Sequence, residues 1–419
     1  MIVMKFGGAS THTPAGIHNV TGIIRSRRAE KPLVVLSAIG KTTRNIERCA
    51  HEAVTGDAES AYHQLDELLA FHLRLLAETL PSDSHRQVGR RIEELGASLH
   101  SLLQGLSIVR ELSPRSFDAC RSHGEKFASA IIMEALNKEG VPVQYIPAEN
   151  IIITDNNYGH ASVKEETVCK NVQKRIIPVI EEGKVALTEG YIGAAEDGTP
   201  TTMGKESSDY TASLLGALCK ASDIQIWTDV NGMMTADPRI VAEAKTIEEL
   251  SYDEAEELAA LGAKILHPLT IAPARNGNIP VHIRNSANLG NNGTVIHAAT
   301  HRASPPKVEA VALMASLKIS GNGQRVVGEE FLLQTPGGAA RFASVADTTG
   351  NAADHCAVSI VGEGVGNDTS LLLRMIAALK PMDIRAVLYG ASKSSASVVL
   401  DASCGEQALR NIHKEFLTS

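Results

Sequence analysis

Short apolar runs alternate with helix-like segments along most of the chain, and this alternation limits the folds open to it. Ile2–Phe6 and Leu33–Leu36 have strand length, and Thr13 and Pro14 between them are typical of a helix start. A chain that alternates in this way builds a mostly parallel sheet with helices on both faces. The sequence therefore predicts an α/β fold. Further strands are predicted at 143–146, 185–189, 224–228 and 281–283, and helices at 124–139, 208–221 and 253–264.

Two stretches interrupt this alternation. Residues 44–110 are polar with recurrent Leu and Ala, a pattern that predicts a helical insertion. Around residues 299–307 a Ser-Pro-Pro run ends the periodicity and marks a domain boundary. After it, residues 311–347 predict strands without a helix, and residues 358–416 predict a βαββα unit of the size of a regulatory module.

Length and composition restrict the class of protein. A chain of 419 residues is too long for one ordinary core, which predicts two or three domains. The formal net charge of −8 gives no general attraction to nucleic acid or to an anionic membrane, so neither is expected as a partner. Six scattered cysteines predict free thiols. No stretch resembles a signal peptide or reaches the roughly 20 apolar residues of a membrane helix, so we expect a cytoplasmic location.

The segment Lys5–Ser10, with the sequence Lys-Phe-Gly-Gly-Ala-Ser, places a cation and two glycines at a predicted strand-to-helix turn. Glycines allow backbone N–H groups to converge on an anion, and the following helix adds the positive end of its dipole. The segment therefore suits a phosphate site. An ordinary tight turn with a solvated lysine explains these six residues equally well.

A second glycine and lysine pair follows the next predicted strand. Gly40 and Lys41 suggest a P-loop, but the earlier glycine that this motif requires would occupy the position of Val35. A P-loop is therefore excluded. Ser37 and Thr43 remain candidate ligand contacts, because α/β sheets bind ligands at the carboxyl ends of their strands.

Two later segments carry polar groups in patterns with two interpretations each. Residues 201–211 place Lys205 and Asp209 directly before or inside a helix start, where they suit either an anion site or simple capping. Residues 227–239 form an acidic loop with Arg239, which suits either a nucleotide or an ordinary ion-paired loop.

In this order and spacing, the segments resemble the aspartate kinases of the amino-acid kinase superfamily. The resemblance covers residues 1–300 closely, and the remainder resembles a weaker version of the family's paired ACT regulatory domains. The matching segments are Lys-Phe-Gly-Gly-Ala-Ser at 5–10, Val-Leu-Ser-Ala-Ile-Gly-Lys-Thr-Thr at 35–43, Gly-Glu-Lys-Phe-Ala-Ser at 124–129, Glu-Gly-Tyr-Ile-Gly at 189–193, Ser-Asp-Tyr-Thr-Ala at 208–212, Trp-Thr-Asp-Val-Asn-Gly at 227–232, Thr-Ala-Asp-Pro-Arg at 235–239 and Gly-Ala-Lys-Ile-Leu-His-Pro at 262–268.

The resemblance implies a three-layer αβα amino-acid kinase fold followed by ferredoxin-like ACT modules. The implied catalytic domain covers residues 1–300, with an amino-acid-binding lobe at about 1–187 and an ATP-binding lobe at about 188–300. The implied ACT-like region covers 308–419, with a reduced first module and a second module at about 354–419.

The implied activity is transfer of the ATP γ-phosphoryl group to the side-chain carboxylate of L-aspartate. The products would be 4-phospho-L-aspartate and ADP, in the biosynthesis of lysine, threonine and methionine. The implied cofactors are ATP and Mg²⁺, with the metal carried by ATP and no metal ligands in the protein. An amino-acid effector at the ACT-like region and a homodimer formed through that region are also implied.

The resemblance assigns roles to single residues as well. Lys5 and Asp209 are the implied catalytic residues, Lys5 beside the transferring phosphoryl group and Asp209 organising the lysine and the substrate. Glu125 would face the substrate ammonium group. The implied phosphate and ATP contacts are Lys5, Gly7, Gly8, Ser10, Thr228, Asp229, Met234, Arg239, Lys264 and Ile265, and the implied substrate contacts are Ser37, Thr43, Glu125, Tyr191, Lys205 and Ser208.

Three departures from the family pattern bear on these roles. Residues 205–207 are Lys-Glu-Ser where the family has Arg-Gly-Gly, so a point charge replaces the guanidinium that would clamp the α-carboxylate. Met234 replaces an aromatic residue near the adenine. The first ACT module lacks its helix, and residues 366–370 of the second lack the Pro-Gly-x-Ala-Ala signature, which puts feedback inhibition by lysine or threonine in question.

The implied chemistry needs no general base, because an aspartate side chain with a pKa of about 3.9 is already ionised at neutral pH. It needs charge neutralisation between two anions, and alignment. Two alternatives stay open: a kinase of the same fold that acts on another amino acid, and a catalytically silent sensor of amino acid or nucleotide. The joint presence of Lys5, Glu125 and Asp209 favours an enzyme.

Overall fold

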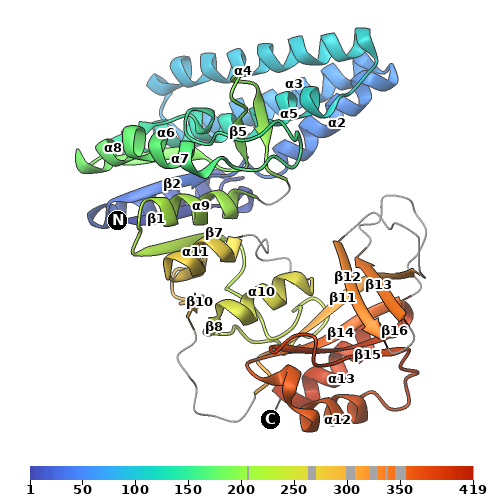
Figure 1. Ribbon diagram of the computed structural model, residues 1–419. Coiled ribbons are helices and arrows are strands. Elements are labelled where there is room, and N and C mark those ends of the chain that lie inside the picture. The colour runs from blue at the N-terminus through green and yellow to red at the C-terminus, as the bar shows by residue number, and fades with distance from the viewer. Residues whose placement is uncertain are drawn as a thin grey trace. The chain divides into compact units, whose positions relative to one another are not determined.

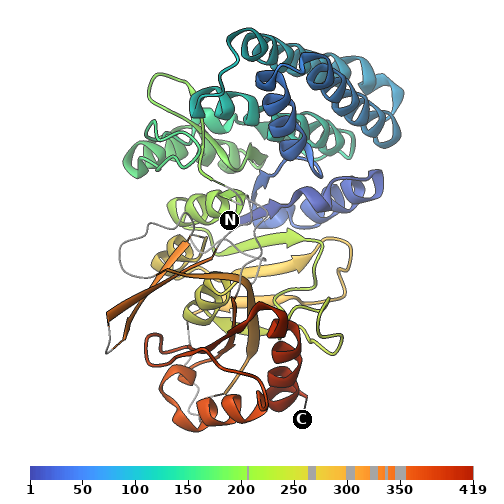
Figure 2. The ribbon, with the colours of Figure 1, turned by 90° about the vertical axis from the view of Figure 1, so that its right-hand side faces the viewer.

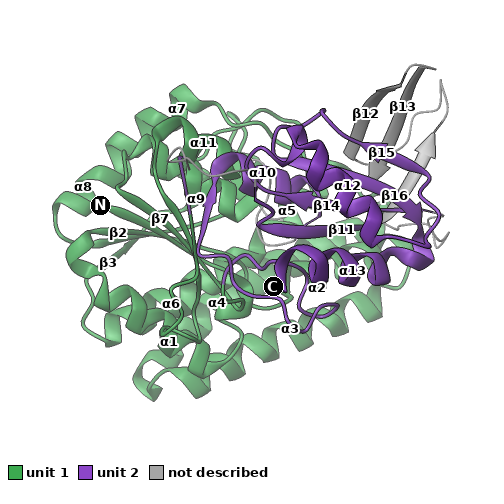
Figure 3. Cartoon of the chain, turned by 90° about the horizontal axis from the view of Figure 1, so that it is seen from below, with its two compact units in different colours: residues 1–231, 269–295 green, residues 232–268, 296–419 purple. Residues whose placement is uncertain are grey.

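The backbone of the chain packs into two compact units, coloured separately in Figure 3, and each is described by itself. Unit 1 comprises residues 1–231 and 269–295, and unit 2 comprises residues 232–268 and 296–419. The computed structural model describes residues 1–204, 207–262, 270–298, 307–320, 329–335, 338–344 and 355–418.

Unit 1 is built on a parallel sheet (Figure 1). Six of its strands follow one another in the order β3-β4-β2-β1-β7-β9, and every neighbouring pair among them is parallel. The predicted mostly parallel sheet is therefore confirmed. The strands are β1 (Ile2–Phe6), β2 (Pro32–Leu36), β3 (Val143–Tyr145), β4 (Val185–Glu189), β7 (Asp223–Thr228) and β9 (Val281–Asn285), and β10 (Thr294–His297) follows β9 in the sheet.

The alternation of side chains along β1 separates the two faces of this sheet. Ile2, Met4 and Phe6 belong to the large core that α1 (Pro14–Ser26) and α6 (His123–Lys138) cover. The intervening residues of β1 point to the opposite face, which α9 (Ser207–Leu218) covers together with α11 (Ile271–Gly277). A layer of helices therefore lies on each face, as predicted.

The helical insertion predicted at 44–110 is confirmed. It consists of α2 (Thr42–Thr55), α3 (Ala58–Thr79) and α4 (Ser82–Val109), which pack on one another and on α6. Buried leucines at helical spacing on α3 and α4 join the core of the sheet. The blue-to-teal helices of Figure 1 thus extend one face of the sheet by a further layer.

Several short elements of unit 1 were not predicted. They carry too few residues for a periodic pattern, and tertiary packing determines their structure. They are α5 (Pro114–Arg121), α7 (Glu165–Asn171), α8 (Ile177–Glu181) and the antiparallel hairpin of β5 (Ile192–Ala194) and β6 (Pro200–Thr202).

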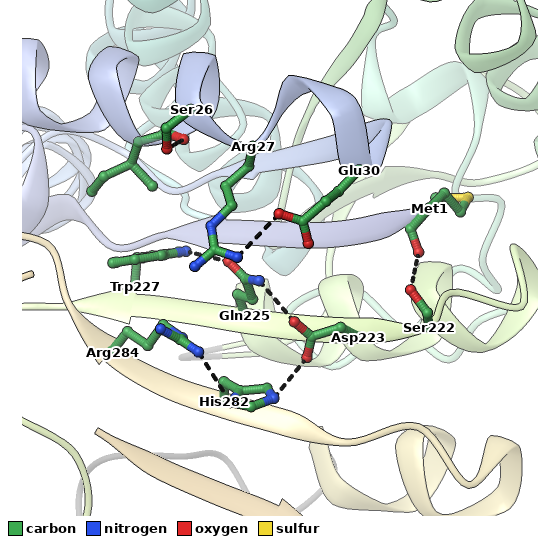
Figure 4. Close-up of polar contacts among 11 residues, drawn as sticks. Met1, Ser26, Arg27, Glu30, Ser222, Asp223, Gln225, Trp227, His282 and Arg284 are labelled. Carbon is green, nitrogen blue, oxygen red and sulfur yellow. Dashed lines mark hydrogen bonds and ion pairs between the residues drawn. The ribbon is translucent and has the colours of Figure 1, made fainter. Parts of the chain in front are cut away.

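A chain of polar contacts fixes Trp227 near the end of β7 (Figure 4). Its indole N–H donates to Gln225 Oε1 at 3.2 Å, and Gln225 Nε2 donates to Asp223 Oδ2 at 2.7 Å. Asp223 Oδ1 lies 3.2 Å from Nε2 of His282 on β9. The Trp227 ring stacks on Phe6 of β1 with centroids 6.1 Å apart. The carboxyl ends of β1 and β7 are thereby held together.

Unit 2 contains an antiparallel six-stranded sheet with the order β12-β13-β11-β14-β16-β15. Its two C-terminal helices lie side by side (Figure 1 and Figure 2). The predicted βαββα unit is confirmed as β14 (His355–Val361), α12 (Thr369–Ala378), β15 (Ala386–Leu388), β16 (Ser395–Asp401) and α13 (Gly405–Leu417). The remaining elements are β8 (Glu249–Ser251), α10 (Tyr252–Ala260), β11 (Ala310–Ser320), β12 (Glu329–Thr335) and β13 (Gly338–Ser344).

The first ACT-like module was predicted as strands without a helix. Within the described part of residues 307–344, β11, β12 and β13 are present and no helix occurs. Residues 232–262 pack against the C-terminal sheet and α13: Thr235 O accepts from Val311 N at 2.8 Å, and Thr235 Oγ1 lies 3.0 Å from Nε2 of His413. The loop predicted to bind nucleotide is therefore held by the ACT-like region.

Candidate active site

Lys5 and Asp209 form a partly buried ion pair at the carboxyl end of β1. Val3 and Lys5 share the face of β1 that meets α9, and Val3 Cγ2 would lie 3.7 Å from a Cβ added at Gly216 of α9. Lys5 Nζ lies 2.5 Å from Asp209 Oδ1, and the two side chains are 12% and 7% exposed. Asp209 is in the first turn of α9, where the helix dipole favours a carboxylate. The pair holds one cation at a fixed place beside the glycine loop.

The loop after β1 lies against the loop after β2 without space for a side chain at Gly8. A Cβ added there would come within 2.3 Å of Ala38 O, and Gly40 N donates to Gly8 O at 3.0 Å. Gly7 N donates to Trp227 O at 3.0 Å. Three strand ends therefore meet at the two glycines. This is the carboxyl edge of the sheet, where α/β proteins bind ligands.

Three hydroxyls lie at this edge. Ser286 follows β9, and its Oγ donates to Ser10 Oγ at 2.7 Å. Ser286 N donates to the carbonyl oxygen of Thr228 at 2.9 Å. Thr228 Oγ1 in turn donates to Asp229 Oδ1 at 3.1 Å. Ser10, Thr228 and Asp229 are thus joined in one hydrogen-bonded run.

Glu125 is buried at the start of α6, and only one of its two carboxyl oxygens has a hydrogen-bond partner among the described residues. Its Oε1 accepts from Ala38 N at 3.3 Å, whereas Oε2 is buried with no hydrogen-bond partner among the described residues. The pKa of Glu125 is raised to about 8, mainly by burial and to a smaller extent by the charge of Glu189, while backbone hydrogen bonds oppose the rise. An unpartnered carboxyl oxygen in such a place suits a cationic ligand group.

Thr43 and Ser37 lie on the same side of the sheet edge as Glu125. Thr43 is in the first turn of α2, and its Oγ1 lies 3.0 Å from a Cβ added at Gly124. Ser37 follows β2, where its N–H donates to Phe6 O at 3.1 Å. The predicted substrate contacts Ser37, Thr43 and Glu125 are therefore neighbours in the structure.

Tyr191 and Ser208 meet at the turn after β4. A Cβ added at Gly190 would lie 2.6 Å from Ser208 Cβ, so this turn presses on the first turn of α9. Tyr191 has a left-handed backbone with φ of 67°, and its N–H donates to Thr211 Oγ1 at 3.2 Å. Burial raises the pKa of Tyr191. The strained turn therefore packs against the first turn of α9, which carries Asp209.

The other predicted nucleotide contacts are not joined to this edge by the described structure. Met234 and Arg239 belong to unit 2, where Met234 Sδ accepts from Thr246 Oγ1 at 3.6 Å. Arg239 is 79% exposed and pairs with Asp237 at 2.5 Å, as the ion-paired interpretation of this loop predicts. Lys205, Lys264 and Ile265 lie outside the described residues.

Asp118 of α5 is a buried site residue that the sequence did not reveal. Its Oδ1 accepts from Thr202 Oγ1 at 2.6 Å, and its Oδ2 accepts from the N–H groups of Thr202 and Gly159, both at 2.8 Å. It therefore anchors the strand that leads to the predicted contact Lys205. Nothing in the local pattern shows a partner 84 residues away.

Glu189 ends β4 and lies near Glu125. It accepts hydrogen bonds from the Tyr145 hydroxyl and, at 2.9 Å, from Ala148 N, and burial raises its pKa. The available signal in the sequence was an acid at the end of a short strand that begins Val-Ala-Leu.

Among the described residues, no group of three or more His, Cys, Asp or Glu is arranged to hold a metal ion. No described helix combines the length and apolar character that crossing a membrane requires.

Comparison with known proteins identifies the family. The model of the amino acid kinase family matches residues 1–285, and an ACT domain model matches residues 358–416. The lysine-sensitive aspartokinase 3 of Escherichia coli strain K12 is 30% identical, over 99% of this chain and 98% of that protein. The chloroplastic aspartokinase 2 of Arabidopsis thaliana is 35% identical over 70% of this chain, which spans 54% of the plant protein.

Solved structures give the same result. The E. coli aspartokinase III in complex with aspartate and ADP superposes with a TM-score of 0.88 at 26% identity, with both chains covered completely. The same E. coli enzyme in complex with lysine and aspartate superposes with a TM-score of 0.79 at 25% identity, covering 100% of this chain and 99% of that one. The chain therefore belongs to the amino acid kinase family, among the aspartokinases that carry an ACT domain at the C-terminal end.

Proposed function

We propose that the chain is an aspartate kinase, which transfers the γ-phosphoryl group of ATP to the side-chain carboxylate of L-aspartate and releases 4-phospho-L-aspartate and ADP. One observation carries the proposal. A single edge of the sheet holds both a buried carboxyl oxygen of Glu125 with no hydrogen-bond partner in the described part of the chain and a fixed cation at Lys5. The carboxyl oxygen of Glu125 suits the ammonium group of an amino acid. The Lys5 cation suits a reaction between two anions, the acceptor carboxylate and the γ-phosphate.

The proposed chemistry depends on Lys5. The attacking carboxylate and the γ-phosphate are both negative, and the carboxylate is already ionised at neutral pH. Lys5, fixed by Asp209, lowers the repulsion between them and stabilises the charge that develops during transfer. The glycines at positions 7 and 8 allow the phosphates to approach the backbone, and Ser10 adds a hydroxyl.

Aspartate is proposed to bind between α2, α6 and α9. Glu125, once ionised, would pair with the substrate ammonium group. Thr43, Ser37, Tyr191 and Ser208 would contact the rest of the amino acid. Lys205 would neutralise its α-carboxylate, so that all three charged groups of aspartate have partners.

ATP is proposed to bind along the strand ends of β1 and β7. Thr228, Asp229, Met234 and Arg239 would contact the nucleotide, together with Lys264 and Ile265. The E. coli relative was solved with ADP, which supports a nucleotide substrate. Mg²⁺ would reach the site on the ATP phosphates and help to neutralise their charge, because the described acidic residues are not grouped to hold a resident ion.

The remaining assignments follow the same proposal. Residues 1–300 would form the catalytic domain, with lobes divided near residue 187, and residues 308–419 the regulatory region. An amino-acid effector is proposed for that region, since the E. coli enzyme was solved with lysine. We further propose that two chains associate through it, which size-exclusion chromatography with light scattering tests.

A trapping assay tests the proposed reaction. Purified protein receives ATP, Mg²⁺, hydroxylamine and one amino acid from a panel, and the acyl phosphate is detected as its hydroxamate. We expect a signal with aspartate alone. A signal confined to another acidic amino acid favours a kinase with a changed acceptor site at residues 205–207. No signal from folded protein that binds amino acid or nucleotide favours a sensor.

A further inference from the structure

His72 is a buried histidine on α3 that no predicted role includes. It is fully buried, and its ring stacks on Phe127 of α6 with centroids 4.7 Å apart. Its Nε2 lies 3.2 Å from Oγ1 of Thr42, the first residue of α2. His72 therefore contacts α2 one residue before Thr43 and α6 two residues after Glu125. These are the two proposed contacts to aspartate that sit on those helices.

Proton counting fixes the direction of the hydrogen bonds of His72. Nδ1 lies 2.8 Å from the carbonyl oxygen of Leu68, which can only accept, so Nδ1 carries a proton. Burial lowers the pKa of His72 to about 4, so the ring is neutral near pH 7 and has a single N–H. Nε2 is then an acceptor, and the hydroxyl of Thr42 is the donor that reaches it.

The Thr42 hydroxyl has one proton and two acceptors within reach. Its Oγ1 lies 2.7 Å from Ile39 O and 3.2 Å from His72 Nε2. Ile39 O also accepts the backbone N–H of Thr42 at 3.1 Å, so it keeps a partner in either case. Nε2 has no second donor among the described contacts, and a buried polar atom without a partner is destabilising. The single proton of Thr42 Oγ1 is therefore shared between Ile39 O, to which it donates at 2.7 Å, and the longer contact with His72 Nε2 at 3.2 Å.

We propose that His72 is a positioning residue for the aspartate subsite, which holds the first turn of α2 against α6 through the Thr42 hydroxyl. The packing there leaves little freedom. Thr43 Oγ1 would lie 3.0 Å from a Cβ at Gly124, and Glu125 Oε1 accepts from Ala38 N in the loop before α2. A shift of this turn therefore moves Thr43 relative to Glu125.

This proposal rests on the proposed function and assigns a positioning role to the helical insertion. The helix α3 contributes no predicted contact to either substrate. Through His72 it nevertheless determines the spacing of two elements that do. Loss of the hydrogen bond is expected to weaken aspartate binding while leaving the Lys5–Asp209 ion pair unchanged, because these two residues lie on β1 and α9.

Steady-state kinetics of four variants tests the role. In His72→Leu and Thr42→Val we expect KM for aspartate to rise about threefold to tenfold, the equivalent of one hydrogen bond. We expect kcat and KM for ATP to stay within about twofold, and the double variant to show no further rise. His72→Gln offers a side-chain oxygen to Thr42 and is expected to recover most of the lost affinity.

Leu75→Ala is the matched control. Leu75 is a core residue of α3, and its truncation should lower stability without removing the hydrogen bond of His72. We expect KM for aspartate to remain that of the wild type in this variant. If His72→Leu and Leu75→Ala instead change KM and kcat alike, the effect is general loosening of α3 and the positioning role is overturned.

The tautomer of His72 is measured independently of catalysis. In ¹⁵N NMR of histidine-labelled protein, with the signal assigned by its loss in His72→Gln, we expect a protonated Nδ1 and an unprotonated Nε2. A proton on Nε2 overturns the inference even if aspartate is a good substrate. Absence of aspartate binding to wild-type protein in calorimetry instead refutes the proposed function, and the positioning role with it.

Discussion

Replacement of Glu125 by glutamine is expected to remove a strong pH dependence of aspartate binding. Burial raises the pKa of Glu125 to about 8, so the carboxyl is mostly protonated in the free protein at neutral pH. A protonated carboxyl cannot pair with the substrate ammonium group, so binding must first ionise it. With a pKa near 8, about one tenth of the sites are ionised at pH 7 and about one hundredth at pH 6.

The magnitude follows from these fractions. In the wild type, KM for aspartate should rise about fivefold from pH 8 to pH 7 and about tenfold from pH 7 to pH 6. In Glu125→Gln the charge is gone, so KM should be higher by about 10- to 100-fold at pH 8.5, the loss of a hydrogen bond to a charged group. It should also be nearly constant from pH 6 to pH 8.5. Initial rates at saturating ATP measure both curves, and parallel pH profiles for the two proteins would refute the reasoning.

Stability gives a second readout of the same group. The folded protein binds a proton at Glu125 between its ordinary pKa of 4.5 and about 8, whereas the unfolded chain does not. This group's contribution to the unfolding free energy is therefore fully present below about pH 4.5 and is lost as pH rises towards 8, by about 1.4 kcal/mol per pH unit. Urea unfolding of wild type and Glu125→Gln without ligands should diverge with this slope, in favour of the variant at pH 8.

Three further substitutions test other parts of the site. Lys5→Ala should lower kcat by at least about 100- to 1000-fold, because the approach of two anions loses its fixed cation, and near-normal kcat would remove Lys5 from the phosphate site. Gly8→Ala should inactivate the protein, since its Cβ would lie 2.3 Å from Ala38 O, whereas Gly22→Ala in α1, with nothing within 4 Å, should keep full activity; equal activity of the two would contradict the close packing of the loops. Lys205→Arg should lower KM for aspartate about fivefold by offering a bidentate fork, and an unchanged KM would mean that Lys205 does not contact the α-carboxylate.

The sequence was most informative where one pattern persists over many residues. The parallel strands are buried apolar runs, and the helices between them are long enough for periodicity to show. The start of α1 was also predictable, because Thr13 accepts from Gly16 N and Pro14 occupies the first turn. Short elements such as α5 and the β5–β6 hairpin carry no comparable pattern.

The candidate site divides in the same way. Lys5, Gly8 and Asp209 stand in recognisable motifs, and the structure brings Lys5 and Asp209 into contact. Asp118 and His72 stand in no motif, and their importance comes from partners distant in sequence, Thr202 and Thr42. Such long-range contacts become visible only once the helices and strands have packed.

The central claim, transfer of a phosphoryl group to the side-chain carboxylate of aspartate, is tested most directly with oxygen isotopes. L-Aspartate carrying ¹⁸O in both side-chain carboxylate oxygens is incubated with the protein, ATP, Mg²⁺ and hydroxylamine. Hydroxylamine attacks the carbonyl carbon of the acyl phosphate, so the bridging oxygen leaves with phosphorus. We predict that mass spectrometry finds one ¹⁸O in each phosphate released, and none when only the α-carboxylate is labelled. Unlabelled phosphate from the side-chain-labelled substrate would contradict the account.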